Sequence, residues 1–150
     1  ISSRHADDLT YLEMDKEDVL KISHDVGDKL TRAEVDIVTK HPIQASTLFR
    51  IKNYSKDQGR AAKASNPLMP EGSYRHVLWN FLLTRQYGEG FAKMVTDAHE
   101  IGDREGEVVE IHHVDYHNNA IGRRWALEKN VTEADILPRV LSDPKVIRKD

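Results

Sequence analysis

The sequence predicts an all-α fold, a single compact domain of about seven helices formed by 150 residues. Apolar side chains recur at helical spacing along most of the chain. No segment alternates apolar and polar residues over six positions, as a half-buried strand would. Capping residues, glycines and prolines divide the helical pattern into segments. With 39% apolar and 31% charged residues, the composition is that of a globular protein with a polar surface.

Three helices are expected in the first third of the chain. The first begins at Asp15, which can cap it, and ends at Gly27. Thr31 and Glu34 form a capping box that opens the second helix. The step at residues 41–42 ends this helix and starts the third, because a residue before proline resists the helical conformation. The apolar stripes expected to be buried are Val19, Ile22 and Val26; Val35, Ile37 and Val38; and Ile43, Thr47, Leu48 and Ile51.

The middle of the chain is expected to hold a break followed by a strong helix. Residues 53–72 are polar and contain two glycines and two prolines, which predicts a loose helical turn around 56–64 and then an irregular loop. Ser73 is expected to cap the next helix, which ends near Gly88. Its apolar stripe consists of Val77, Leu78, Phe81 and Leu82.

Three further helices complete the expected fold. One covers 89–100, and a turn over 102–106 separates it from a helix over 107–130. A second capping arrangement at 132–135 opens the last helix. The inward positions are expected to be Phe91, Met94, Val95 and Ala98; Val108, Ile111, Val114, Ile121, Trp125 and Leu127; and Ile136, Leu137, Val140 and Leu141.

Composition and charge exclude several classes of protein. The net charge of −3 excludes a strongly basic protein that coats nucleic acid non-specifically. Residues 41–95 nevertheless carry 8 basic and 3 acidic groups, which suits an anionic substrate or merely reflects differently solvated helical faces. Without cysteine, the chain has no disulfide, thiolate nucleophile or Cys-ligated zinc. The longest apolar stretch, over 77–83, is too short for a transmembrane segment.

Three segments concentrate polar residues that packing does not require, and the first is at 74–80. On a helix Arg75 and Trp79 lie one turn apart, as do His76 and Asn80. The apolar stripe lies beside them, so His76 and Asn80 border the core and can still reach a cavity. The alternative is a capped histidine that belongs to the core.

The second segment is a helix end at His99 and Glu100. An adjacent His and Glu can supply one metal ligand and one general base. They can equally form a solvated helix end, where a protonated His99 would favour the negative end of the helix dipole. The second histidine of the HExxH zinc helix is absent.

The third segment, residues 110–123, is the densest. On a helix Asp115, Asn119 and Arg123 form one polar ladder. His113 and His117 form a second ladder, and their one-turn spacing can bind a divalent metal through two imidazoles. Asn and Asp are poor residues inside a helix, and such locally unfavourable choices occur most often at functional sites.

Antiparallel packing of the three helices can bring the three segments to one pocket. That pocket would hold an acid–base pair, metal ligands and an anion-binding arginine, the groups that hydrolyse an ester or a phosphodiester. No Ser stands in a G-x-S-x-G elbow, which favours direct water activation or attack by an internal hydroxyl. A divalent metal is a candidate cofactor, with His113 and His117 as its candidate ligands. The expected catalytic residues are His76, Arg75, His99, Glu100, Asp115 and His117, and the expected substrate-binding residues are Trp79, Asn80, Asn118, Asn119 and Arg123.

Four ordered motifs cover about residues 41–125, namely HPIQA, YRHVLWNFLLTRQYG, DAHE and DYHNNAIGR. Their order resembles a family of bacterial domains that share the pattern RHxxWN…HE…DxHNNxxGR. Domains of that family lie at the C-terminal end of large secreted or cell-surface proteins, including contact-dependent inhibition, Rhs-type and WapA-like polymorphic toxins. The residues that match its polar signature are Arg75, His76, His99, Glu100, Asp115, His117 and Asn119.

The resemblance implies a toxin context. The chain would be part of a larger secreted polypeptide, would act inside a target bacterial cell after delivery from the producing cell surface, and would be held inactive by a cognate immunity protein. Residues 41–150 would form the helical toxin domain. Residues 1–40 lie outside the motif pattern and would form a helical segment that serves delivery.

The leading hypothesis from the sequence is an antibacterial toxin domain with hydrolase activity, a ribonuclease that acts on RNA in the target-cell cytoplasm. One alternative is a hydrolase of lipid or cell-envelope esters, for which Trp79, Phe81 and Leu82 would supply an apolar face. The other alternative is a binding module without catalysis, in which the polar motifs satisfy one another as a buried hydrogen-bonded network.

Overall fold

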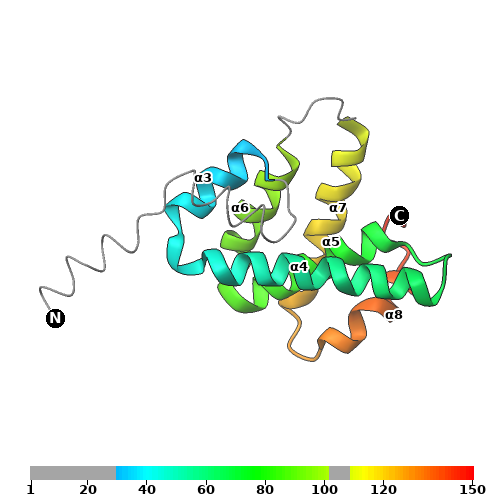
Figure 1. Cartoon of the computed structure of the whole chain (residues 1–150). Coiled ribbons are helices and arrows are strands. Elements are labelled where there is room, and N and C mark those ends of the chain that lie inside the picture. Colours follow the sequence, from blue (N-terminus) through cyan, green and yellow to red (C-terminus); the bar gives the residue numbers. More distant parts are fainter. Residues whose placement is uncertain (1–29, 102–108) are drawn as a thin grey trace, which may run out of the picture.

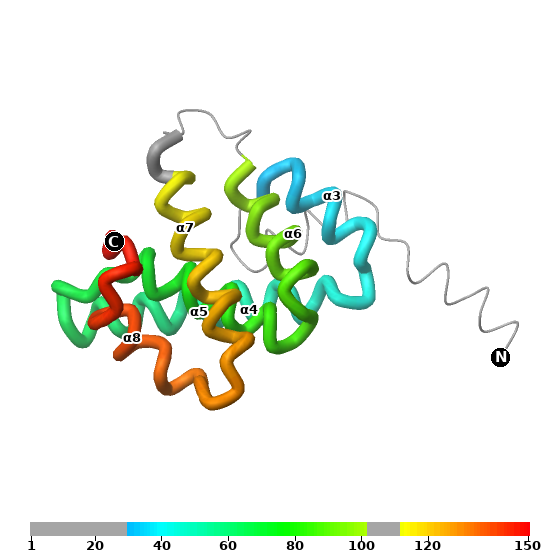
Figure 2. The backbone as a smooth tube through the Cα atoms, turned by 180° about the vertical axis from the view of Figure 1, so that it is seen from behind, coloured from blue at the N-terminus to red at the C-terminus, as the bar shows by residue number. Residues whose placement is uncertain are grey.

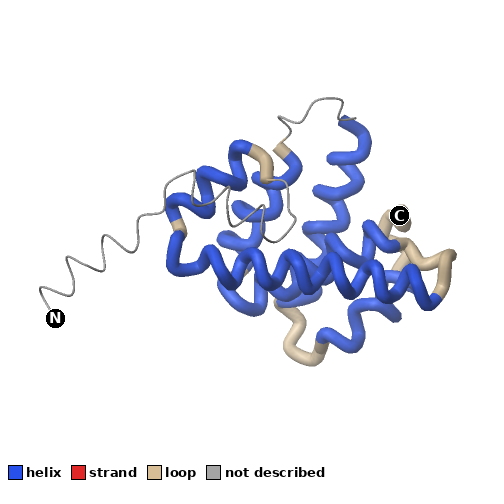
Figure 3. Tube along the Cα trace, in the orientation of Figure 1, coloured by secondary structure: helices blue, strands red, loops and turns tan. Residues whose placement is uncertain are grey.

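The computed structural model describes residues 30–101 and 109–150 of the chain. Within these residues every regular element is helical, as predicted (Figure 3). The expected helix over 15–27 and the turn over 102–106 lie outside the described residues. The elements are α3 (Arg32–Lys40), α4 (Pro42–Ser65), α5 (Glu71–Tyr87), α6 (Glu89–Glu100), α7 (Val109–Ala126), the 3-10 turn η1 (Glu133–Asp135) and α8 (Ile136–Ser142).

Helix α5 lies at the centre of the fold and contacts α4, α6, α7 and α8. Helices α6 and α7 contact each other, and both views show them on the same side of α4 and α5 (Figures 1 and 2). Helix α3 contacts α4 and α6 at the other end of the domain. The three helices that carry the polar motifs, α5, α6 and α7, therefore pack against one another in pairs.

The predicted boundaries of α3 and α6 are confirmed. Thr31 and Glu34 form a reciprocal capping box, in which the Glu34 N–H donates to Thr31 Oγ1 (3.1 Å) and the Thr31 N–H donates to Glu34 Oε1 (2.9 Å). His41 ends α3, and Pro42 occupies the first position of α4. Helix α6 covers 89–100, as the sequence predicts.

The expected break after residue 53 is wrong, because α4 continues without interruption to Ser65. Its glycine, Gly59, is buried where the start of α5 passes close by: a Cβ there would lie 3.3 Å from the carbonyl oxygen of Glu71. The glycine therefore serves helix packing rather than a turn. The buried stripe of α4 is also different from the predicted one, and Ile43 is 69% exposed. The buried positions are Ala45, Leu48, Phe49, Lys52, Ser55 and Gly59.

Other expectations differ in detail. Ser73 does not cap α5, which begins two residues earlier at Glu71; its hydroxyl instead donates to the carbonyl of Ile147 (2.7 Å). Helix α7 ends at Ala126 rather than near residue 130. Three side chains predicted to point inward are exposed. Met94 and Leu141 lie off the buried stripes of α6 and α8, and Leu127 lies past the end of α7.

The largest apolar cluster joins α5 to α7 and α8. It includes Val77, Leu78 and Phe81 on α5, together with Ile121, Trp125, Ile136 and Val140. Gly122 lies where α5 and α7 cross, since a Cβ there would lie 2.3 Å from the Val77 carbonyl oxygen. No side chain fits in this gap, so the glycine lets the two backbones approach and brings the polar residues of α7 close to α5.

A search of the described helices finds none that is both long and apolar enough to cross a bilayer.

Candidate functional site

A buried histidine on α5 lies where the three motif-bearing helices meet. His76 is 2% exposed, and its Nδ1 lies 2.9 Å from Asn119 Oδ1 on α7 and 3.7 Å from Glu100 Oε2 on α6. Its Nε2 lies 3.5 Å from Asp115 Oδ1, also on α7. We refer to His76, Glu100, Asp115 and Asn119 as the His76 cluster. One residue or more from each motif segment therefore surrounds a single imidazole ring.

Helix geometry explains how these residues meet. Asp115 and Asn119 are four positions apart, so both project from one face of α7 toward α5. Gly122 continues the same helix at the point of closest approach to α5. Glu100 is the last residue of α6, where the helix end reaches this face.

Three polar atoms of the cluster are buried without a hydrogen-bond partner in the part of the chain that the structure describes. They are Glu100 Oε2, Asp115 Oδ1 and Asn119 Nδ2. Asp115 Oδ1 does form an ion pair, with Lys149 Nζ at 2.7 Å, but not in hydrogen-bond geometry. Leaving a buried polar group unpaired costs about 1–3 kcal/mol, more when it is charged, so three such atoms at one place call for a reason beyond stability.

His76 is neutral over the whole physiological range of pH. Burial lowers the pKa of its imidazole to about 3, with a contribution from the Arg75 guanidinium, although the Asp115 charge acts in the opposite direction. Asn119 Oδ1 can only accept, so Nδ1 carries the proton and donates it to that oxygen. The lone pair of the ring is then on Nε2, which faces Asp115 Oδ1 and lies 3.5 Å from Arg75 Nη2.

Glu100 has two different surroundings. Its Oε1 accepts from His112 Nδ1 at 2.8 Å, whereas its Oε2 points at His76. Burial raises the pKa of the Glu100 carboxyl, an effect that His99 and His112 oppose and the Asp115 charge reinforces. His112 was not among the expected site residues, because no spacing rule connects it to the end of α6.

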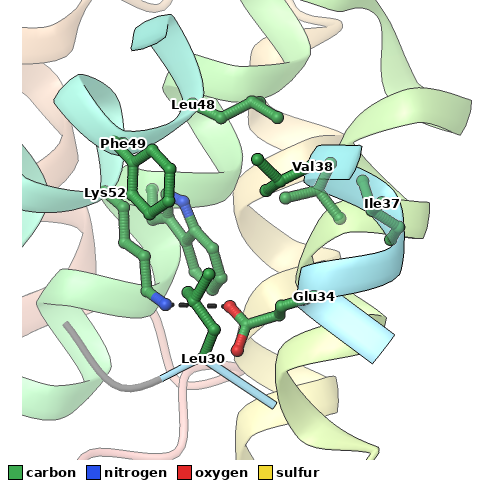
Figure 4. A pocket seen from close by; sticks show the side chains of 9 residues that line it. Leu30, Glu34, Ile37, Val38, Leu48, Phe49 and Lys52 are labelled. Atoms are coloured by element: carbon green, nitrogen blue, oxygen red, sulfur yellow. Dashed lines mark hydrogen bonds and ion pairs between the residues drawn. The ribbon is translucent and has the colours of Figure 1, made fainter. Parts of the chain in front are cut away.

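His99 belongs to a neighbouring ion-pair network rather than to the His76 cluster. Its Nδ1 lies 3.2 Å from Glu34 Oε2, the oxygen that also accepts from Lys52 Nζ at 2.8 Å (Figure 4). Burial would raise the pKa of Glu34, but the hydrogen bond from His99 and the Lys52 charge outweigh it and lower this pKa to about 2. The two groups are adjacent: the ring centre of His99 lies 6.1 Å from that of His76, and the Trp79 ring centre lies 5.4 Å from that of His99 and 6.1 Å from that of His76.

The sequence did not single out Glu34 or Lys52 as site residues. Glu34 is already explained by the capping box, and Lys52 is a charged residue within a polar helical stretch. Both are buried, and they line a small cavity of about 20 Å³ together with Leu30, Ile37, Val38, Leu48, Phe49, Trp79 and Val95 (Figure 4). A space of that size holds about one water molecule.

Asn80, Thr96 and Arg123 form a buried polar link between α5, α6 and α7. Arg123 Nη1 donates to Asn80 Oδ1 (2.8 Å) and to Thr96 Oγ1 (3.2 Å). The Thr96 hydroxyl also donates to Asn80 Oδ1 (2.8 Å). Burial lowers the pKa of Arg123 from its ordinary value. Both Asn80 and Arg123 were expected to bind substrate, but here they hold the three helices together beside His76.

Two expected site residues point away from the cluster. His113 and His117 are exposed, and His117 Nε2 lies 2.6 Å from the Lys145 carbonyl oxygen. Each residue on a helix is rotated by about 100°, so His117 lies about 200° from Asp115 and cannot share its face. The structure therefore does not place the candidate His113–His117 metal ligands, or the expected catalytic His117, beside His76.

Asn118 holds the C-terminal segment against the helices. Its Nδ2 donates to the Ile147 carbonyl (2.8 Å), and its Oδ1 accepts from the Ile147 N–H (3.1 Å). Ser73 Oγ accepts from the Lys149 N–H at 2.7 Å. These bonds place Lys149 where its ammonium reaches Asp115. Asn118 is thus positioned for this structural role rather than for the substrate binding expected from the sequence.

Residues 35–143 match the sequence model of a family described as a domain of unknown function, DUF6973. The chain belongs to the DUF6973 family. No curated protein and no solved structure is significantly similar to it. The match contains all four residues of the His76 cluster, whereas Lys149 lies beyond it.

The chemistry available to this DUF6973 domain follows from the cluster. A neutral imidazole lies between two buried carboxylates, and the lone pair on its Nε2 faces the Arg75 guanidinium at 3.5 Å. Such a group can hold a cation, which would activate a water molecule. The DUF6973 domain thus has, in one place, residues from all three segments that the sequence singles out.

Proposed function

We propose that this domain is a toxin that hydrolyses phosphodiester bonds in RNA, and that the His76 cluster is its catalytic centre. The observation that carries the proposal is the convergence of three buried polar atoms without a hydrogen bond, from two different helices, around one neutral imidazole on a third. Hydrophobic residues of similar volume would stabilise the fold as well or better. The polar choice therefore favours chemistry over packing.

The position of Arg75 favours an anionic substrate. Its guanidinium is half-buried and lies 3.5 Å from the unprotonated Nε2 of His76. A guanidinium there can hold a phosphate oxygen and stabilise the negative charge that develops in the transition state. Arg75 and the Lys149 ammonium, whose side chain is 26% exposed, lie toward solvent from the buried His76, so we expect the substrate to approach from their side.

RNA is favoured over DNA and lipid because it brings its own nucleophile. The chain offers no cysteine and no serine in a nucleophile elbow. The 2′-hydroxyl of RNA needs only an acid–base group and a cation beside the phosphate. The unprotonated Nε2 of His76 is a weak proton acceptor, and Arg75 next to it supplies the cation.

The toxin context is supported by the resemblance of the four ordered motifs to domains at the C-terminal ends of secreted toxins. In this proposal the domain is delivered from the producing cell surface into the cytoplasm of a target bacterium. A cognate immunity protein binds it in the producing cell and blocks access to the His76 cluster.

The test combines cleavage assays with growth inhibition. The purified chain and its His76→Ala variant are incubated with total RNA, plasmid DNA and phospholipid vesicles, and both are expressed in a susceptible bacterium. His113→Ala is the matched control, because His113 is exposed and outside the cluster. We expect RNA cleavage and growth inhibition by the wild type and by His113→Ala, and neither by His76→Ala.

Two outcomes would overturn the proposal. Hydrolysis of the vesicles with intact RNA would instead identify a lipid hydrolase. Undiminished growth inhibition by a folded His76→Ala variant would indicate a binding module without catalysis.

A further inference from the structure

We infer that His76, Glu100 and Asp115 together bind one divalent transition-metal ion. One ligand atom from each residue lies within 4.8 Å of the other two. Atoms that each lie about 2.0–2.2 Å from a common ion are about 3–4 Å from one another. The separation of 3.5 Å between His76 Nε2, the nitrogen with the lone pair, and Asp115 Oδ1 is of this size. Glu100 Oε2 lies beside the same ring, 3.7 Å from Nδ1.

The two carboxylate oxygens that lack a hydrogen bond are a second and independent observation. Glu100 Oε2 and Asp115 Oδ1 are the carboxylate oxygens that face the imidazole, and both are buried without a hydrogen bond. The two residues are only 4% and 5% exposed. A divalent cation would coordinate both oxygens and compensate two buried negative charges in one step.

Residues around these three ligands already hold them in orientation. Asn119 Oδ1 accepts the Nδ1 proton of His76, which leaves the Nε2 lone pair for a metal ion. His112 holds the other oxygen of Glu100 at 2.8 Å. Hydrogen bonds of this kind to ligating His and carboxylate groups are the usual support of a protein metal site.

The donor set indicates which metals fit. One imidazole nitrogen with two carboxylate oxygens suits Mn²⁺, Fe²⁺ or Zn²⁺, whereas Mg²⁺ and Ca²⁺ prefer oxygen ligands throughout. An ion of this class acts as a Lewis acid and lowers the pKa of bound water. As an account of catalysis the inference rests on the proposed hydrolase function, but the ion itself can be measured without any substrate.

The Lys149 ammonium would compete with a metal ion for Asp115 Oδ1. The ammonium lies 2.7 Å from Asp115 Oδ1, so an ion on that oxygen has to displace it. Lysine has a long flexible side chain, and 26% of this one is exposed, so it can turn into solvent. Loss of the Lys149 charge is therefore expected to strengthen metal binding.

The first experiment measures binding to the chain of 150 residues after EDTA treatment and dialysis. Mn²⁺, Zn²⁺ and Mg²⁺ are titrated separately by calorimetry into the wild type, Glu100→Gln, Asp115→Asn and His113→Gln. We expect one Mn²⁺ or Zn²⁺ per chain, weaker Mg²⁺ binding, and a loss of affinity of roughly tenfold or more in the Glu100 and Asp115 variants. His113→Gln should bind like the wild type. Circular dichroism and melting curves establish that each variant is folded.

Failure of wild-type binding would overturn the inference, and so would loss of binding in His113→Gln with retention in a folded Glu100→Gln. RNA cleavage that persists in EDTA, without ion binding, would support the proposed function and overturn the inference of a metal site. Ion binding without hydrolysis of any substrate would support the metal site and overturn the proposed function.

A second variant tests the ion's place at Asp115. Lys149→Met keeps the length of the side chain but removes the ammonium. We expect it to bind Mn²⁺ or Zn²⁺ at least severalfold more tightly than the wild type. Unchanged or weaker affinity would contradict coordination through Asp115 Oδ1.

Discussion

Asn119 Oδ1 accepts the Nδ1 proton of His76 at 2.9 Å. An asparagine of the HNN motif on α7 thus fixes the tautomer of the histidine in the RH motif on α5. The consequence is chemical, since it leaves the lone pair on Nε2, next to Asp115 and Arg75. Two motifs that are 43 residues apart in the sequence thus act through one hydrogen bond.

Asn119→Ala is expected to reduce RNA cleavage and metal affinity by roughly 10–100-fold, because the His76 ring loses the bond that selects its tautomer. The stability change should be small, about 1 kcal/mol, since one buried hydrogen bond is lost. Nitrogen chemical shifts of His76 by NMR report the tautomer directly. Unchanged shifts together with unchanged activity would refute the positioning role of Asn119.

Gly122→Ala is expected to destabilise the fold strongly. The added Cβ would meet the Val77 carbonyl oxygen at 2.3 Å, which is backbone and cannot turn aside. Helices α5 and α7 must then separate, at an expected loss of about 1–3 kcal/mol or more in the free energy of unfolding. Urea denaturation measures this loss, and the separation should also weaken metal binding because Asp115 and Asn119 move away from His76.

Gly90 provides the matched control for this substitution. It lies in α6 with no atom within 4 Å of its added Cβ. Gly90→Ala should stabilise the chain by about 0.5–1 kcal/mol through helix propensity. Equal changes in unfolding free energy for the two substitutions would show that close packing at Gly122 does not contribute to stability.

Much of this arrangement could be predicted from local sequence. Capping and proline rules predict the ends of α3, and antiparallel packing of three helices predicts that Arg75, His76, Glu100 and Asp115 meet. The capping and helix-end signals involve neighbours in the chain, and the polar ladder of Asp115 and Asn119 follows from helical spacing alone.

Which of two equally polar faces of α7 points toward α5 could not be predicted from the sequence. His113 and His117 have the same one-turn spacing as Asp115 and Asn119, and only packing decides which pair faces inward. That packing depends on Gly122. In the sequence a glycine at this position indicates a weak point of the helix, whereas in the structure it makes room for the Val77 carbonyl. Contacts over long distances in the sequence, such as Lys149 with Asp115, have no local signal.

The ion pair of Glu34 with Lys52 and His99 should make stability depend on pH in the acid range. The pKa of Glu34 in the folded chain is about 2, against an ordinary value of 4.5. A lowered folded pKa means that the unfolded chain binds the proton first as the pH falls, so the stabilisation is complete above about pH 5 and is lost toward pH 2. A shift of this size corresponds to about 3 kcal/mol.

Urea denaturation of the wild type and Glu34→Gln at several pH values measures this contribution. The difference in unfolding free energy between the two should be largest near neutral pH and should shrink steadily below about pH 4.5. A difference that stays constant down to pH 2 would show that the Glu34 charge does not contribute to stability.

Asn118→Ala distinguishes a structural role from the substrate-binding role that the motif suggests. Asn118 makes two hydrogen bonds to the backbone of Ile147, and both would be lost. We expect a loss of about 1–3 kcal/mol in stability, and release of the C-terminal segment should move Lys149 away from Asp115. Metal affinity should therefore rise in Asn118→Ala, as in Lys149→Met, whereas it falls in Asn119→Ala. Calorimetric titration of the three variants side by side checks this order, and a joint fall in Asn118→Ala and Asn119→Ala would assign both asparagines to the site.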